Sequence, residues 1–401
     1  MDLIGWVIFI VALLVSVMLH ETGHFVLAKK FGMKVTRYFV GFGPTIWSTW
    51  RGETEYGIKA LPFGGFVKIV GMHSLDDPDD PADEPRSFRN KPGWQRILVL
   101  LAGSAMHFLL ALVLIFGLAL TIGIANNNVT ELGTISRCVP TSLTAYDHGT
   151  CGSPHAPSSP AKLAGLRVGD TVTAFNGHPV SNFTQLGDAI RAVPPGAEAT
   201  ITVRRDGKLV TLRITPASVT GRSGSYLGVG PATLFQIPSP LGAIKYAGTT
   251  FGQVVTGSAQ AVTTIPKALP VLFNKAKRST TAAGQVTSIV GAAQITGTEV
   301  ASSVGWQYKV SFVLLLIASL NIFFGLFNLL PLLPLDGGHI AVIVYERIRA
   351  WLARLRGRPD PGLVDMAKLL PVSFSLFVLI ELFSVTVVLA DIINPLQLPG
   401  G

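Results

Sequence analysis

The sequence predicts a polytopic α-helical membrane protein with four transmembrane helices, a membrane-associated β-rich loop and an inserted α+β domain. Three observations lead to this prediction. Of 401 residues, 49% are hydrophobic and 14% are charged, and the mean hydropathy is +0.48, which is too apolar for a soluble protein of this length. Four stretches are long enough to cross a bilayer, and basic residues gather in two of the connecting loops.

The four apolar stretches have the length that a membrane requires. A bilayer core of ~30 Å needs about 20 apolar residues in a helix. The expected spans cover residues 3–27, 97–124, 312–333 and 371–393. The first span is not expected to be a cleaved signal peptide, because it lacks a basic n-region and an A-x-A cleavage site.

The positions of the basic residues predict the topology. The net charge is +9. The loop between spans one and two holds Lys29, Lys30, Lys34, Arg37, Arg51, Lys59, Lys68, Arg86, Arg89, Lys91 and Arg96, and the loop between spans three and four holds Arg347, Arg349, Arg354, Arg356, Arg358 and Lys368. The positive-inside rule makes both loops cytoplasmic, and residues 125–310 and both termini then face outward. Because these charges flank spans and form no polybasic run, we expect no nucleic-acid partner.

An H-E-x-x-H motif, residues 20–24, lies at the end of the uncharged segment 3–19. Imidazoles at i and i+4 share one helix face and can bind one zinc ion, and Glu21 between them is placed to take a proton from water activated by that metal. At 1.5 Å per residue, His20 lies ~26 Å along the span, in its cytoplasmic third. The alternative is a helix end with two incidental histidines, but ionisable residues at membrane depth usually have a function.

The third zinc ligand is expected near residue 336. A catalytic zinc usually has three protein ligands and one water. Residues 328–339 read N-L-L-P-L-L-P-L-D-G-G-H. Pro331 and Pro334 break the helix at membrane depth. Two glycines directly follow Asp336, so that its carboxylate can approach a metal without steric hindrance. The alternative is an aspartate that caps the following helix.

The first loop contains strand-like sequence. Residues 55–70 predict two short strands with a Pro/Gly turn, and residues 41–44 are another glycine-rich apolar stretch. A β-rich loop at 41–72 can re-enter the bilayer where protein buries it. The acidic residues 76–84 predict a mobile cytoplasmic loop.

A compact soluble unit is expected within residues 126–220. Its core, 131–220, contains a strand from Gly133, a short helix and turn at 159–170, a strand at 171–175, a helix at 182–191 and a hairpin across Asp206-Gly207. The pattern S-P-A-x-x-A-G-L-x-x-G-D resembles a PDZ domain of the bacterial protease-associated kind; another small α+β module is the alternative. PDZ domains accept an extended peptide beside a strand, here Gly133–Ile135.

Both cysteines lie in the outward loop. Cys138 and Cys151 fall in an insertion, 138–158, and predict a disulfide in an oxidising compartment. The alternative is a second metal site with His148 and His155, although no tight C-x-x-C spacing supports it.

Residues 221–306 are expected to be an extracytoplasmic amphipathic linker. Apolar residues recur at helical spacing between 240 and 300. An additional span there would put Asp336 on the opposite side from His20, so we expect helices that lie on the outer leaflet. The membrane core is then divided into a first half, 1–125, and a second half, 307–401.

The motif H-E-x-x-H followed late in the chain by N-x-x-P-x-x-x-L-D-G resembles the site-2 protease family of intramembrane zinc metalloproteases (M50 type), most of all its actinobacterial branch that cuts anti-sigma factors. The resemblance implies that His20, His24 and Asp336 bind Zn2+, that Glu21 is the general base, and that Asn328 holds the substrate or its oxyanion. Substrate is also expected to pair with the strand edge at Gly64, Gly65 and Phe66.

The resemblance also implies partners and a location. The expected substrate is a transmembrane protein such as an anti-sigma factor, trimmed first by an upstream site-1-type protease. The chain would be a multi-pass protein of the plasma membrane lipid bilayer. Its PDZ domain would be extracytoplasmic, either reading a new C-terminus or excluding bulky ectodomains, and its active site would lie in the cytoplasmic third of the bilayer.

The chain departs from the family at one motif. Family members usually carry A-G-P-x-x-N-F where this chain has A-G-S-A-M-H-F, residues 102–108. His107 is either a polar contact near the metal or, as we prefer, a hydrogen-bonded histidine of the bundle. Glu381 is expected to face the bundle interior and pair with a polar neighbour. Rival functions are a transporter or chaperone with inert zinc and a PDZ scaffold with relic catalytic residues; the complete His20, Glu21, His24 and Asp336 set argues against relics.

Overall fold

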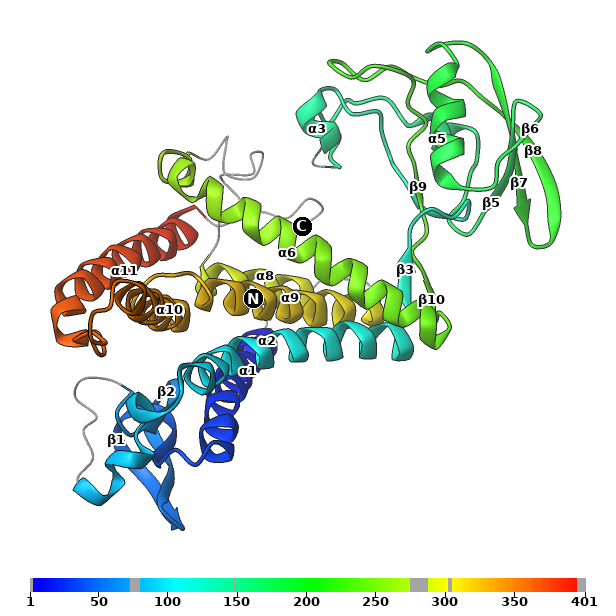
Figure 1. The fold of residues 1–401 in the computed structure, drawn as a ribbon. Coiled ribbons are helices and arrows are strands. Elements are labelled where there is room, and N and C mark those ends of the chain that lie inside the picture. The colour runs from blue at the N-terminus through cyan, green and yellow to red at the C-terminus, as the bar shows by residue number, and fades with distance from the viewer. Residues whose placement is uncertain (1–2, 73–79, 148, 275–287, 302–304, 395–401) are drawn as a thin grey trace. The chain divides into compact units, whose positions relative to one another are not determined.

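The structure is a computed structural model that describes residues 3–72, 80–147, 149–274, 288–301 and 305–394. The chain divides into two compact units, one of residues 1–119 and 239–396 and one centred on residues 120–238 (Figure 1). The acidic residues 76–79 and His148, for which we made predictions, lie outside the described residues.

Four of the described helices are long and apolar enough to cross a membrane, as expected. They are α1 (Leu3–Lys30), α2 (Gly93–Thr121), α9 (Trp306–Asn328) and α11 (Leu370–Ile393). The third begins and ends earlier than the predicted 312–333. Pro331 and Pro334 follow its end, and proline lacks the N–H that continues a helix.

Two further helices pack against these four. Helix α6 (Pro240–Leu272) contacts α2 through Phe108 and Phe251, whose ring centroids lie 5.7 Å apart. Helix α8 (Ile289–Ala301) buries Ala292 and Ala293 against Phe9 of α1. Residues 240–300 are therefore helical where the structure describes them, but α8 is part of the packed bundle and not only a surface helix.

Helix α10 (Asp336–Leu355) follows α9, and a 3-10 turn (Met366–Leu369) leads into α11. The buried residues of α11 lie in its last three turns, including Val387, Ala390 and Asp391. Glu381 lies on another face and is exposed. The expectation that Glu381 faces the bundle interior is wrong, because α11 packs on its neighbours through its C-terminal half.

The first loop forms a two-stranded antiparallel sheet, β1 (Val35–Arg51) and β2 (Thr54–Ile69). Both strands bend, so that residues 37–40 of β1 pair with 65–68 of β2 on one side and with 55–58 on the other. The two short strands expected at 55–70 are thus the halves of β2. They do not pair with each other, because the first half of β1 lies between them.

This sheet docks on α1 through aromatic and hydroxyl groups. Tyr38 Oη lies 2.7 Å from Thr22 Oγ1, and the Tyr38 ring packs edge-on to Phe25 at a centroid distance of 5.3 Å. Two 3-10 helices (Pro81–Arg86 and Phe88–Asn90) complete the loop, and Phe88 is buried in the same cluster as Ala28 and Val99. The sheet is therefore held at the end of α1 that carries the H-E-x-x-H motif.

The second unit is a small α+β fold. Its four-stranded antiparallel sheet has the order β6-β5-β7-β8. The strands and helices are β3 (Ile124–Asn126), β4 (Leu132–Ile135), α3 (Leu143–Asp147), α4 (Pro160–Leu163), β5 (Thr171–Phe175), β6 (His178–Pro179), α5 (Phe183–Ala192), β7 (Ala199–Arg205), β8 (Lys208–Ile214), β9 (Val229–Pro231) and β10 (Leu234–Gln236). Leu186 and Ile190 of α5 pack on Ile201 and Val203 of the sheet.

The unit continues beyond the predicted boundary at residue 220. Strand β9 pairs with β4, Leu227 is buried in the core, and β10 pairs with β3. The chain thus enters and leaves this unit through two adjacent strands.

The structure confirms the expected disulfide. Cys138 and Cys151 are bonded, with their Cα atoms 5.7 Å apart. The two thiols are consequently not available as ligands of a second metal site.

Candidate active site

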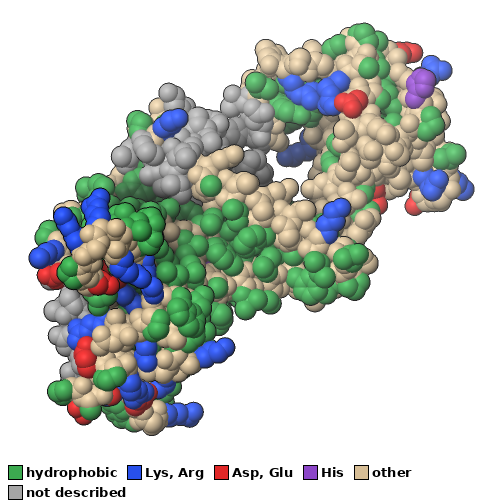
Figure 2. All heavy atoms as spheres, viewed as in Figure 1, with side chains coloured by type: hydrophobic (Ala, Val, Ile, Leu, Met, Phe, Trp, Pro, Cys, Tyr) green, Lys and Arg blue, Asp and Glu red, His purple; other side chains and the backbone are tan. Residues whose placement is uncertain are grey.

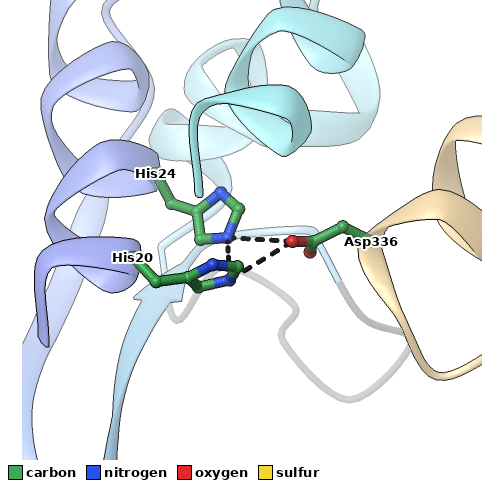
Figure 3. A group of neighbouring side chains, drawn as sticks. All are labelled: His20, His24 and Asp336. Atoms are coloured by element: carbon green, nitrogen blue, oxygen red, sulfur yellow. Dashed lines mark hydrogen bonds and ion pairs between the residues drawn. The ribbon is translucent and has the colours of Figure 1, made fainter. Parts of the chain in front are cut away.

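Helix α1 brings the two histidines of the motif together. His20 and His24 lie one turn apart, and their Nε2 atoms approach to 3.0 Å (Figure 3). Both side chains are buried, with 11% and 4% of their surface exposed. Two imidazole nitrogens that face each other at this distance need a shared proton or a cation between them.

Asp336 reaches the same point from α10. Its Oδ2 atom lies 3.3 Å from His20 Nε2 and 3.3 Å from His24 Nε2 (Figure 3). The turn before it is compact, because a side chain at Gly337 would collide with the carbonyl oxygens of Leu329 and Leu330. The glycines after Asp336 are therefore needed to fold the proline-containing turn back against α10.

The three donor atoms fit a zinc ion. Tetrahedral zinc with bonds of about 2.0–2.1 Å separates its ligand atoms by about 3.3 Å, and the three distances here are 3.0, 3.3 and 3.3 Å. Among the described residues, these three are the one group of His, Cys, Asp or Glu side chains that lies close enough to hold a metal ion. Two imidazoles and one carboxylate are a donor set that zinc prefers.

A backbone contact orients the second histidine. His24 Nδ1 lies 2.7 Å from the carbonyl oxygen of Val99. A carbonyl oxygen only accepts, so Nδ1 carries the proton and Nε2 keeps its lone pair toward Asp336. This is the arrangement by which proteins usually fix a metal-binding tautomer.

Two glycines allow α1 and α2 to approach at the site. A Cβ atom at Gly103 would lie 2.5 Å from His20 Cε1 and 2.6 Å from His24 Nε2. A Cβ atom at Gly23 would likewise meet the carbonyl oxygen of Ala102. We did not identify either glycine as a site residue from sequence, although Gly23 lies inside the motif.

Glu21 is held by the edge of the β-sheet. The backbone N–H of Val67 donates to Glu21 Oε2 across 2.9 Å. Gly65 lies against Met18 of α1. Gly64 faces Val17, because a Cβ atom added at Gly64 would lie 3.9 Å from Val17 Cγ1. The second half of β2 therefore runs alongside the turns of α1 that carry His20 and Glu21.

The other predicted substrate-binding residues lie on the same elements. Phe66 stacks on Phe39 with the ring planes 7° apart. Asn328 is the last residue of α9, and the turn that follows it packs against Gly337, next to Asp336.

A buried polar chain lies beside the candidate metal ligands. His107 Nδ1 lies 2.8 Å from Asn321 Oδ1, and Asn321 Nδ2 donates to Ser16 Oγ at 3.0 Å and to the carbonyl oxygen of Ile317 at 2.8 Å. The His107 and His20 ring centroids are 5.0 Å apart. His107 is thus a hydrogen-bonded bundle histidine that also packs against His20. The sequence alone identified neither Asn321 nor Ser16.

Comparison with known proteins identifies one family and several relatives. The profile of Peptidase family M50 matches residues 8–358. The chain is 37% identical over 413 residues to the zinc metalloprotease Rip1 of Mycolicibacterium smegmatis, with 98% of both chains covered. It is 38% identical over 415 residues to zinc metalloprotease Rip1 of Mycobacterium tuberculosis, again over 98% of both chains. A putative zinc metalloprotease of Clostridium perfringens, CPE1693, is 30% identical over 333 residues, covering 83% of this chain and 85% of the relative.

Proposed function

The chain belongs to peptidase family M50, the site-2 protease family of intramembrane zinc metalloproteases, and we propose that His20, His24 and Asp336 hold its zinc while Glu21 is the general base. The observation that carries the proposal is the triangle of two Nε2 atoms and one Oδ2 atom, 3.0–3.3 Å apart, drawn from α1 and α10. Glu21 belongs to the same turn of α1 as His20 and His24.

The catalytic roles follow from the chemistry of these groups. Zinc held by these three side chains would supply Lewis-acid chemistry, polarising the scissile carbonyl and lowering the pKa of water to about 7. The Glu21 carboxylate takes the proton from the attacking water and passes it to the leaving amine. The Val67 N–H keeps Glu21 turned toward the sheet edge. Val99 holds His24 in the tautomer that leaves Nε2 free to bind metal.

We propose that the substrate is a transmembrane segment that unwinds locally at this site. A helical segment has its peptide groups paired internally, so cleavage needs an extended stretch. The edge of β2 at Gly64, Gly65 and Phe66 is suited to pair with that stretch, because it runs beside Glu21 and carries little side-chain bulk at its two glycines. Asn328 is proposed to hold the substrate backbone or the oxyanion from the end of α9.

The substrate class and topology are further parts of the proposal. The basic loops between the spans favour a cytoplasmic β-sheet and a cytoplasmic α10, with the site in the cytoplasmic third of the bilayer. The second unit is proposed to be an extracytoplasmic PDZ domain, supported by its packing of α5 on a four-stranded antiparallel sheet. Anti-sigma factors trimmed by a site-1-type protease are the proposed substrates, as in the family branch that the motifs resemble.

A reporter membrane protein in detergent tests this assignment. Wild-type protein should cut it, and Glu21→Gln should keep bound zinc and lose cleavage, because the base is removed while the ligands remain. His24→Ala should lose zinc as well as activity. Cleavage by Glu21→Gln near the wild-type rate, or full zinc content in His24→Ala, contradicts the assignment.

A further inference from the structure

Helix α10, which begins at Asp336, has two faces of different character. One face packs on α2: Ile343, Glu346 and Ala350 are buried, and Arg96 of α2 donates to Glu346 Oε2 across 3.0 Å. Arg347 also lies against Gly93 of α2, whereas Val344 and Ile348 are exposed. The helix is therefore attached to the core along one side only.

The opposite face is a continuous apolar stripe. Its members recur at the i, i+4, i+7, i+8 and i+11 spacing of one helix face and are Val344, Ile348, Trp351, Leu352 and Leu355. All five are exposed, Trp351 by 57% and Leu355 by 65%. No part of the chain that the structure describes covers this stripe, and a contiguous exposed apolar surface marks an interaction site.

Arginines border the stripe. By the 100° turn per residue, Arg347 and Arg354 lie on one side of it and Arg349 and Arg356 on the other. Arg347, Arg354, Arg356 and Arg358 are exposed. The single acidic residue from 344 to 358 is Glu346, which is already paired with Arg96. Figure 2 shows Lys and Arg side chains gathered at the left end of the core, where α10 joins the loop to α11.

The position of α10 in the chain places it at a membrane surface. It follows α9 and precedes α11, and both are long and apolar enough to cross a membrane. An amphipathic helix with a basic border lies in the interface, with its apolar face in the acyl boundary and its arginines among the headgroups.

We propose that the outer face of α10 binds the anionic phospholipids of the leaflet in which its basic loop lies. Only the assignment of this leaflet to the cytoplasmic side of the membrane rests on the proposed function. The apolar stripe enters the acyl region, and Arg354, Arg356 and Arg358 contact phosphate groups. Anionic lipid is favoured over a zwitterionic one because the exposed charged residues from 344 to 358 are all arginines.

A spin label on α10 tests the proposal directly. Both cysteines of the chain form the disulfide, so Ile348→Cys introduces the one free thiol. The protein is reconstituted in nanodiscs of phosphatidylcholine with or without phosphatidylglycerol, and label accessibility to oxygen and to a water-soluble nickel complex gives the depth. Ala353→Cys, about 140° around the helix, is the matched position.

We expect the label at 348 to be protected from nickel and accessible to oxygen, and to shift deeper when phosphatidylglycerol is present. The label at 353 should not shift. Replacing Arg354, Arg356 and Arg358 together by Gln should abolish the shift. Replacing Arg204, Lys208 and Arg213 of the second unit by Gln removes equal charge and should leave it unchanged.

Three results would overturn the proposal. A label at 348 that is as accessible to the nickel complex as a label on a water-exposed residue, in both lipids, shows that the stripe is not in the bilayer. The same depth with and without phosphatidylglycerol shows that the arginines do not recognise anionic lipid. Dipolar coupling between labels shows that a second copy covers the face. The label reports no catalysis, so each result leaves the proposed protease assignment untouched.

Discussion

The backbone N–H of Val67 donates to Glu21 Oε2 across 2.9 Å, which joins two groups that are 46 residues apart in the chain. One belongs to the outer strand half of the β-sheet and the other to the zinc-binding motif of α1. Val67 is paired with Tyr38 in the sheet while its N–H reaches Glu21. Sheet and motif therefore form one structural unit, in which a strand orients the proposed general base.

Removing this N–H should weaken catalysis without removing the metal. Val67→Pro leaves Glu21 without its donor, and a hydrogen bond to a charged group is worth about 1.5–3 kcal/mol, or roughly 10–100-fold in rate. We expect kcat/KM to fall in that range while zinc content stays at the wild-type level. Val67→Ala keeps the N–H and serves as the control; an equal loss in both variants would show that the side chain matters and not the hydrogen bond.

Gly103 should be intolerant of any side chain. Its Cβ would lie 2.5 Å from His20 Cε1 and 2.6 Å from His24 Nε2, and those rings cannot retreat without leaving the metal site. Gly103→Ala should therefore lower zinc content and activity together. Gly117→Ala is the control on the same helix, because nothing lies within 4 Å of its new Cβ. It should leave the free energy of unfolding unchanged or raise it by up to ~1 kcal/mol. The two variants are compared by zinc analysis and thermal unfolding. A wild-type zinc content in Gly103→Ala would contradict the prediction.

The polar chain beside His20 should stabilise the metal site. His107→Ala removes the hydrogen-bond donor to Asn321. Asn321 also donates to Ser16, so this chain of hydrogen bonds connects α2, α9 and α1. The His107 ring packs against the His20 ring at a centroid distance of 5.0 Å, so its removal should loosen His20 and zinc should be lost faster to a chelator. His107→Asn restores a donor and should recover most of the retention time. Equal zinc release from all three proteins would mean that the chain serves only helix packing.

The second unit should lose stability in acid because of one carboxylate. Burial alone would raise the pKa of Asp170, but hydrogen bonds from Arg205 at 2.7 Å and from the backbone N–H of Arg167 at 2.8 Å outweigh it and lower that pKa. The stabilisation is present above the unfolded pKa of about 3.9 and is lost as pH falls through the lower folded value. The hydrogen-exchange protection factors of β5 and β7 in the full chain, which are corrected for the intrinsic pH dependence of exchange, should fall below about pH 4 in wild type and depend less on pH in Asp170→Asn.

Removing the second unit should affect substrate choice and not bond cleavage. Asn126 pairs with Leu234 across β3 and β10, so deleting residues 127–233 joins two neighbouring positions. Because no proposed zinc ligand or base lies in this unit, we expect a pre-trimmed substrate to be cut normally and an untrimmed one to be cut prematurely. A variant that is folded, holds zinc and cuts neither substrate would show that the unit is needed for productive binding.

Local patterns in the sequence were sufficient for much of this protein. The i, i+4 spacing of His20 and His24 and the length of the apolar stretches depend only on helix geometry, and both predictions agree with the structure. The disulfide between Cys138 and Cys151 also followed from composition and spacing. Asp336 was assigned as the third ligand through its motif and family resemblance, and the structure brings it beside both histidines.

The tertiary structure decided what depends on contacts between distant segments. Residues 55–70 have the composition of strands, but no local signal shows that the first half of β1 lies between their two halves. Glu381 is polar within an apolar span, yet its exposure depends on which face of α11 meets the bundle. Asn321 joins His107, 214 residues away, and Ser16, 305 residues away. Helix periodicity specifies which residues share a face, whereas the partner of that face is set by how the helices pack, and this packing depends on the whole chain.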